Sequence, residues 1–300
     1  MLGLSMLWAV FTIIAAAAQT ARNAMQRELT TTLGTVGATQ VRFLFGFPFA
    51  IVFLIGVCAV TGSGLPSPSL SYWPWVLLGA GGQIVATTLM LAAMNDRSFV
   101  VTTAYIKTEP VQTAVFGLLL LGDKLTPLLG LAIVIATAGV IVMAVKPGAA
   151  RVNGIKPTVM GIVAGGMFGL SAIAFRGAIL SLGIPDRFVL AATFTLAVSL
   201  VTQAAVLMVY LVLRQPNVLR AILKAWRPSM LAGFMGALAS QFWFLGFAIA
   251  SAASVRTLAL VEVLFAQGVS KFVFKQPTSL REIVGIVMII VGVVLLIWAH

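Results

Sequence analysis

Long runs of apolar residues follow one another along nearly the whole chain, separated by short polar stretches. Each run holds the roughly 20 residues that a helix needs to cross a bilayer, and none alternates apolar and polar positions as membrane-spanning strands do. The pattern therefore predicts an all-α integral membrane protein with ten transmembrane helices. The predicted spans cover residues 3–25, 35–60, 72–94, 98–121, 125–145, 158–182, 187–213, 228–250, 252–274 and 280–299.

The connections between these spans are short, so no separate soluble domain is expected. The longest of them cover residues 147–156 and 214–227. The first apolar run has no basic segment before it, which favours a retained first span over a cleaved signal peptide.

An internal repeat divides the chain into two halves. Four pairs of identical residues lie 153 or 154 positions apart, namely Glu109 and Glu262, Gly139 and Gly292, Arg22 and Arg176, and Gly79 and Gly233. Because five is odd, two five-helix halves must cross the membrane in opposite senses, as in the inverted repeats of many secondary transporters. We therefore expect a first repeat at 1–145, a connecting loop at 146–157 and a second repeat at 158–300.

The composition excludes the soluble classes of protein. Hydrophobic residues make up 61% of the chain and charged residues 9%, against roughly 25% charged residues in a soluble domain. The net charge of +12 does not indicate nucleic-acid binding, because Lys and Arg lie mainly in short loops between apolar runs. With one cysteine, Cys58, and one histidine, the chain is expected to hold no intrachain disulfide, metal site, catalytic triad or cofactor.

The basic residues also predict the orientation of the chain. The loops after odd-numbered spans carry 13 Lys and Arg residues, whereas those after even-numbered spans carry only Lys124 and Arg187. Since short cytoplasmic loops are enriched in positive residues, we expect the odd loops in the cytoplasm and both termini outside.

Several short motifs resemble the EamA domain. They are Arg42-Phe43-Leu44 in the second span, Thr108-Glu109-Pro110-Val111 in the fourth, the following turn Gly122-Asp123-Lys124, and Ala138-Gly139-Val140 and Val291-Gly292-Val293 in the fifth and tenth. Their order is similar to the ten-helix EamA branch of the drug/metabolite transporter superfamily, over nearly the whole chain. The second half departs from the family pattern, with Val263 where proline is usual. The resemblance implies a bacterial inner-membrane transporter of metabolites or drugs.

Charged residues inside the spans are the first candidates for function, because a charge at the centre of a bilayer costs roughly 2.5–3.5 kcal/mol. These residues are Arg42, Lys107, Glu109, Arg176, Arg256 and Glu262. The alternative is a structural role, in which charge pairs hold helices together or long side chains reach the interface. That structural role is favoured for Arg176 and Arg256, which lie near the ends of their spans.

Glu109 is the most informative of these residues. Tyr105, Glu109 and Gln112 share one helical face and would offer a substrate an aromatic wall, a carboxylate and an amide. Pro110 predicts a kink or a loosened turn beside them. Lys107 lies about 200° away around the helix, so it is not expected to pair with Glu109. The alternative is a proline kink for packing, with Glu109 held by an arginine of a neighbouring helix.

Glu262 occupies the matching position in the second half. On inverted halves, Glu109 and Glu262 could face one central cavity, and both are candidates for carrying a coupled proton. The alternative is that Glu262 only neutralises a neighbouring arginine.

Polar side chains on other spans add candidate substrate contacts. Gln19 and Arg22 belong to a polar stripe on the first span, where Arg22 could hold the carboxylate of a zwitterion. A helix end that emerges among lipid headgroups would show the same stripe. Gln83 in the third span and Gln241 and Trp243 in the eighth complete the set, although an ordinary lipid-facing tryptophan is an equal alternative for Trp243.

These features predict a secondary transporter that exports small metabolites, such as amino acids or related amphipathic compounds, from the bacterial cytoplasm by alternating access. Its expected partners are a small-molecule substrate, the lipid bilayer and, if a carboxylate titrates, protons. Exchange of one substrate for another is equally compatible. The alternatives are export of drugs or organic cations and, less favoured, an intramembrane lipid-modifying enzyme.

Overall fold

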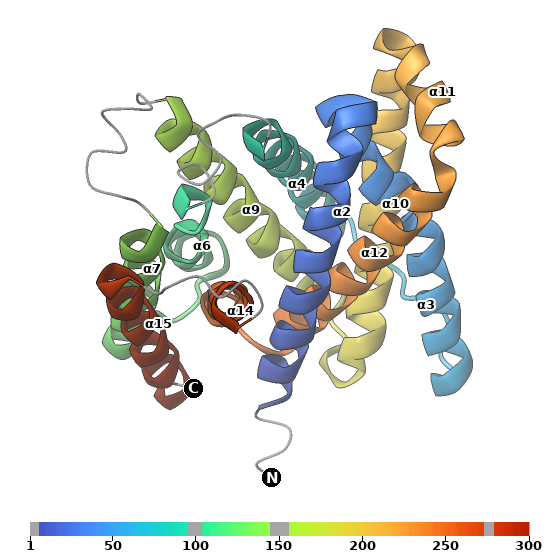
Figure 1. The fold of residues 1–300 in the computed structure, drawn as a ribbon. Coiled ribbons are helices and arrows are strands. Elements are labelled where there is room, and N and C mark those ends of the chain that lie inside the picture. Colours follow the sequence, from blue (N-terminus) through green and yellow to red (C-terminus); the bar gives the residue numbers. More distant parts are fainter. Residues whose placement is uncertain (1–5, 95–103, 145–155, 273–278, 300) are drawn as a thin grey trace.

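The computed structural model describes residues 6–94, 104–144, 156–272 and 279–299, and every regular element in these ranges is helical (Figure 1). The α-helices are α2 (Leu7–Leu44), α3 (Phe47–Thr61), α4 (Tyr72–Met94), α6 (Glu109–Phe116), α7 (Pro127–Ala144), α9 (Lys156–Ser181), α10 (Phe188–Arg214), α11 (Pro216–Lys224), α12 (Trp226–Ile249), α13 (Ala252–Leu258), α14 (Val261–Phe272) and α15 (Leu280–Trp298). A π-helical turn, η1 (Gly117–Leu121), extends α6, and a 3₁₀ turn, η2 (Pro185–Arg187), precedes α10. The connecting loop predicted at 146–157 lies almost wholly outside the described residues.

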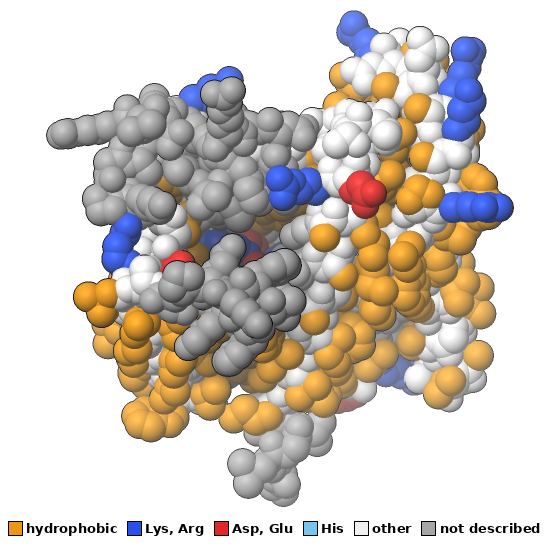
Figure 2. Space-filling model, in the orientation of Figure 1, with side chains coloured by type: hydrophobic (Ala, Val, Ile, Leu, Met, Phe, Trp, Pro, Cys, Tyr) orange, Lys and Arg blue, Asp and Glu red, His pale blue; other side chains and the backbone are white. Residues whose placement is uncertain are grey.

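The outer surface of this bundle suits a membrane. Seven helical stretches in the described residues are long and apolar enough to cross a bilayer, the first of them formed by α2 and α3 together. Large apolar side chains such as Val60, Leu119 and Leu213 point outward instead of into the protein, and hydrophobic side chains cover the flanks seen in Figure 2. The all-helical membrane class predicted from the sequence is therefore confirmed.

Helix α2 contains the reversal between the first two predicted spans. We expected a loop between residues 25 and 35. Instead, residues on both sides of Gly34 are helical, and the chain changes direction at Gly34, whose φ is 67°. The Gln26 side chain donates a hydrogen bond to the Ala38 carbonyl at 2.9 Å. In a straight helix these residues would be about 18 Å apart, so the chain must turn back on itself. Glycine permits this turn because a side chain would strain a positive φ.

The predicted fourth and ninth spans are interrupted helices. A turn at Lys107 and Thr108 stands immediately before α6, which begins with Glu109 and Pro110. This is the interruption that Pro110 predicted. A second turn, at Ala259 and Leu260, separates α13 from α14 without the help of a proline.

Close helix pairs hold the bundle together. The most extensive contacts join α2 to α12, α4 to α9 and α7 to α15. Glycines make the last pair possible: a Cβ on Gly139 would lie 2.8 Å from the Gly285 carbonyl oxygen, and one on Gly292 would lie 2.9 Å from the Ala132 carbonyl oxygen. Small residues at such interfaces let backbones approach in lipid, where no hydrophobic force draws helices together.

The predicted loop at 214–227 contains a helix, which corrects the sequence-based expectation. Helix α11 (Pro216–Lys224) is amphipathic: Ile222 is fully buried against the bundle, while Arg220 and Lys224 are exposed. The segment reads as a loop because it is too short and too polar to span a membrane. It lies at the end of the molecule opposite the start of α2 and the end of α15 (Figure 1), and basic side chains gather there (Figure 2).

Replacing Gly34 tests the reversal inside α2. Nothing lies within 4 Å of a Cβ built on this residue, so Gly34→Ala adds only the strain of a positive φ, about 1 kcal/mol or more. We expect a lower melting temperature in detergent. Gly56→Ala is the matched control, because Gly56 has equally open surroundings in the regular helix α3, where alanine stabilises by about 0.5–1 kcal/mol. Equal melting temperatures for the two variants would contradict this account.

Candidate functional site

A polar cavity of about 90 Å³ lies between the interrupted helices and α2. Its lining combines both charge signs with apolar side chains: Gln19, Arg22 and Asn23 from α2, Met90 from α4, Ile106, Lys107 and Glu109 from the segment around the first interruption, Phe168 from α9, Arg256 from α13 and Glu262 from α14. Charged side chains are visible inside a hollow on the face seen in Figure 2. The two halves of the sequence thus meet at one charged site.

Two ion pairs cross this site. Arg256 Nε lies 2.9 Å from Glu109 Oε1, with side chains that are 7% and 12% exposed. Lys107 Nζ pairs with Glu262 Oε1. Each pair joins a residue of the first half to a residue of the second, so both interruptions are tied to each other by charge.

The interruptions explain why both carboxylates stand here. Glu109 and Glu262 each occupy the first turn of a short helix, α6 and α14. The free N–H groups of a first helical turn carry a partial positive charge, which stabilises a carboxylate nearby. Gly165 and Gly169 of α9 let the first interruption approach closely, since a Cβ on Gly165 would lie 2.7 Å from the Ile106 carbonyl oxygen.

Arg256 is also fixed by aromatic rings of α12. Its guanidinium carbon lies 4.5 Å from the ring centroid of Trp243 and 5.3 Å from that of Phe247. A cation over a ring face is stabilised by the ring's quadrupole. The Trp243 indole Nε1 donates to Gln19 Oε1 at 3.1 Å, which connects this stack to α2.

The structure brings together six of the candidate residues named from the sequence, namely Gln19, Arg22, Lys107, Glu109, Arg256 and Glu262. Lys107 does not pair with Glu109 on its own segment, as its angular position indicated, and instead reaches Glu262. Sequence reasoning favoured a structural role for Arg256, which the structure places in the cavity wall as the partner of Glu109.

The other candidates lie outside the cavity lining. Gln112 donates to Thr108 Oγ1 at 2.9 Å and to the Ile162 carbonyl at 3.2 Å, so it faces α9. Gln83 accepts a hydrogen bond from Gln203, and Gln241 donates to Thr193. Tyr105 is half-buried, and Trp243, which is not a lining residue, contacts the lining residues Arg256 and Gln19.

Sequence reasoning missed three apolar lining residues, Met90, Ile106 and Phe168. Nothing in the sequence singles them out, because apolar residues fill every span. Only the packing of α4 and α9 against the first interruption places them at the site.

A second group of charges lies around Arg176. This side chain lies 3.7 Å from Asp123 and donates to the carbonyl groups of Phe247, at 2.6 Å, and of Ala250. Those carbonyls belong to the end of α12, where backbone acceptors lack helical partners. Arg176 therefore joins α9 to the end of α12, in line with the structural role expected for it.

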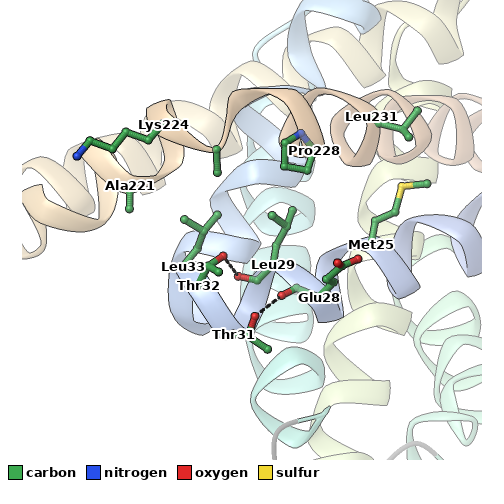
Figure 3. A pocket seen from close by; sticks show the side chains of 11 residues that line it. Met25, Glu28, Leu29, Thr31, Thr32, Leu33, Ala221, Lys224, Pro228 and Leu231 are labelled. Atoms are coloured by element: carbon green, nitrogen blue, oxygen red, sulfur yellow. Dashed lines mark hydrogen bonds between the residues drawn. The ribbon is translucent and has the colours of Figure 1, made fainter.

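A larger cavity, of about 640 Å³, lies between residues 25–33 of α2 and residues 221–231, where α11 ends and α12 begins (Figure 3). Its wall is mostly apolar, with Glu28 and Lys224 as its charged members. Thr31 and Thr32 donate their hydroxyl protons to carbonyls of α2 itself. No buried charge pair lies among its lining residues, so the smaller cavity is the better candidate site.

The fold and the charged intramembrane site define a multi-pass membrane protein with a polar cavity between its halves. Residues 5–145 match the EamA-like transporter family. The first half of the chain is therefore similar to this family of the drug/metabolite transporter superfamily, and the similarity indicates a membrane transporter of the drug/metabolite type.

One solved structure supports the same fold over the whole chain. It is described only as the crystal structure of a protein, and it aligns with a TM-score of 0.64 over 97% of this chain and 99% of its own, at 15% sequence identity. No curated protein matches the chain.

A double-mutant cycle tests the pair between Glu109 and Arg256. Glu109→Gln and Arg256→Gln each leave one buried charge unpaired, so each should lower the free energy of unfolding by about 3–5 kcal/mol. The double variant should lose less than the sum of the two. Arg220→Gln, at an exposed position, serves as the control and should change stability by less than about 0.5 kcal/mol. Strict additivity of the two single changes would show that the pair contributes nothing.

Proposed function

We propose that the protein is a secondary transporter that exports small metabolites, such as amino acids or related amphipathic compounds, by alternating access. The observation that carries this proposal is the pair of ion pairs, Glu109 with Arg256 and Lys107 with Glu262, which joins opposite halves of the chain across a polar cavity. In a membrane, such charges are maintained where a polar pathway needs them.

The proposed architecture is ten spans in two inverted halves, at 1–145 and 158–300, joined by 146–157. The helix pairs support this architecture. At the repeat offset of 153 or 154 residues, α2 corresponds to α9 and α4 to α12, so the α2–α12 contact has its equivalent in the α9–α4 contact. Helix α7 corresponds to α15, and these two helices contact each other. The contact of Gly139 with Gly285 likewise corresponds to that of Gly292 with Ala132. Interruptions in corresponding helices of two repeats are typical of transporter binding sites.

The proposed mechanism is a rocking of one half against the other around the cavity. Such a motion must separate or exchange the ion pairs, because each pair has one member on each half. Parting a buried pair without a replacement leaves costly unpaired charges. A substrate or a proton that enters as the pair opens would supply that replacement, which would couple its binding to the motion.

Glu109 and Glu262 are the candidates for the proton step. A proton on Glu109 would neutralise it when Arg256 moves away, and the same holds for Glu262 and Lys107. Gln19 and Arg22 are the proposed substrate contacts that line the cavity. Substrate binding stays a prediction for five further residues, which do not line the cavity: Tyr105, Gln112, Gln83, Gln241 and Trp243.

Two alternatives are less well supported. Export of drugs or organic cations would need more room, because drug-sized ligands occupy cavities of roughly 300–1,000 Å³, whereas this one measures about 90 Å³. An intramembrane lipid-modifying enzyme would need a free acid or base, but each carboxylate of the site is paired with a cation.

The proposed location is the bacterial inner membrane, with the odd loops in the cytoplasm and both termini outside. The exposed basic residues at and beside α11, among them Arg214, Arg220, Lys224 and Arg227, support this orientation. An amphipathic helix at that end would rest among the headgroups of the inner leaflet.

Glu109→Gln tests the proton step in proteoliposomes. The variant keeps the shape of the side chain but cannot carry a charge, so we expect loss of pH-driven accumulation with substrate exchange retained. Labelled amino acids and short carboxylates serve as substrates, and Glu28→Gln, an exposed carboxylate, is the control. If the variant keeps pH-driven accumulation at the wild-type rate, Glu109 carries no coupled proton. Loss of both pH-driven accumulation and substrate exchange would assign Glu109 a structural role alone.

A single cysteine tests the orientation. In a Cys58→Ser background, Asn217→Cys places a thiol on the exposed side of α11. We expect no reaction with a membrane-impermeant thiol reagent in intact cells and full reaction after permeabilisation. Rapid labelling of intact cells would place α11 outside and both termini in the cytoplasm. Position 148, in the other long loop, lies outside the described residues.

A further inference from the structure

Arg22 is a buried cation of the cavity without a carboxylate partner among the described residues. Its side chain lines the cavity and is 1% exposed. Nη2 donates to Asn23 Oδ1 at 2.7 Å, but Nε and Nη1 meet no acceptor in the described parts of the chain. Most of the N–H donors of this guanidinium are therefore unused.

The chain offers few carboxylates that could serve Arg22. Glu109 and Glu262 are taken by Arg256 and Lys107. Asp123 faces Arg176. Of the remaining acidic residues, Glu28 lines the larger cavity, Asp186 is exposed in η2, Glu282 caps α15, and Asp96 lies outside the described residues.

A second buried arginine increases the positive charge beside Arg22. Arg42 is 2% exposed and donates to Thr87 Oγ1, and its Nε meets no acceptor in the part of the chain that the structure describes. Both arginines pack on Gly236, since a Cβ built there would lie 3.3 Å from Arg22 Cδ and 3.3 Å from Arg42 Cγ. Two adjacent buried cations repel each other, so this corner of the site is stabilised by an added negative charge.

We propose that Arg22 binds the carboxylate of an anionic substrate in this cavity. A guanidinium offers a planar fork that matches the two oxygens of a carboxylate. Gln19 lies one helical turn from Arg22, and its Oε1 accepts a hydrogen bond from Trp243. The N–H groups of the Gln19 amide are therefore the ones that would donate to the substrate carboxylate. Met90, Ile106 and Phe168 form the apolar part of the wall and suit a short aliphatic body.

The charge pattern favours an anion over a zwitterion. A substrate ammonium group would need a free carboxylate, but both carboxylates of the cavity are paired with Lys107 and Arg256. The unpaired charge in the cavity lining is that of Arg22, which is positive. The inference rests on the proposed transport function only in calling the ligand a substrate, because binding can be measured without transport.

The test uses purified full-length protein and three probes of equal length: butanoate, butanamide and butylammonium. Each probe is titrated at matched ionic strength while the melting temperature is measured, since a ligand that binds the folded state raises it. Butanoate should raise the melting temperature of the wild type, and the other two should not. This comparison needs no variant, so it stands even if a substitution at Arg22 prevents folding.

Variants then assign the effect to Arg22. Arg22→Gln should weaken the apparent affinity for butanoate by about tenfold or more, because it removes a charge-assisted hydrogen bond. Arg22→Lys should retain part of the affinity. Arg176→Gln changes an arginine that lies outside the cavity lining and faces Asp123, so this control should retain most of the affinity. An equal response to butylammonium, no response to butanoate, or unchanged butanoate affinity in Arg22→Gln would each overturn the proposal.

Flux measured on the same preparations separates this inference from the proposed function. If carboxylate binding depends on Arg22 but no flux is measured in proteoliposomes, the transport proposal is contradicted and the anion site is supported. Flux of amino acids or organic cations that is unchanged in Arg22→Gln would remove the anion site and leave transport.

Discussion

The structure depends on pairing carboxylates with cations inside a helical bundle, where little water reaches them. Glu109 with Arg256 and Lys107 with Glu262 satisfy this constraint by joining the two halves of the chain at their centre. A charge left alone there would cost several kcal/mol. At the site the two ion pairs link the halves of the chain, and elsewhere the packed helix pairs α2–α12, α4–α9 and α7–α15 link them.

The same constraint accounts for the broken helices. An unbroken helix would satisfy its own backbone and leave no helical N-terminus inside the bundle. The turns at 107–108 and 259–260 create two such ends, and each places a carboxylate in a first helical turn. Irregular backbone is tolerated at membrane depth where it borders a polar cavity. Fold and site are thus consequences of one arrangement.

Around this centre the bundle consists of close, small-residue contacts. Gly139, Gly285 and Gly292 bring α7 and α15 into backbone contact, and Gly165 allows α9 to support the first interruption. These contacts contribute dispersion energy and shape but few specific polar bonds. The proposed movement of one half against the other would have to separate or exchange the two ion pairs as well as shift these packed helices.

The sequence by itself determined the membrane class, the helical character of the chain and the break at Pro110, and it named Glu109 and Glu262 as candidate site residues. These follow from local properties: run length, proline geometry and the cost of a charge in lipid. The tertiary structure decided which charges meet. Arg256 stands near a helix end in sequence, and only the packing of α13 against α6 brings it to Glu109. Gln112 shares a helical face with Glu109, yet the approach of α9 turns it away from the cavity. Periodicity shows which residues share one face of a helix. Ion-pair partners that lie about 150 residues apart in sequence depend on how the helices pack against one another, and no single segment determines that packing.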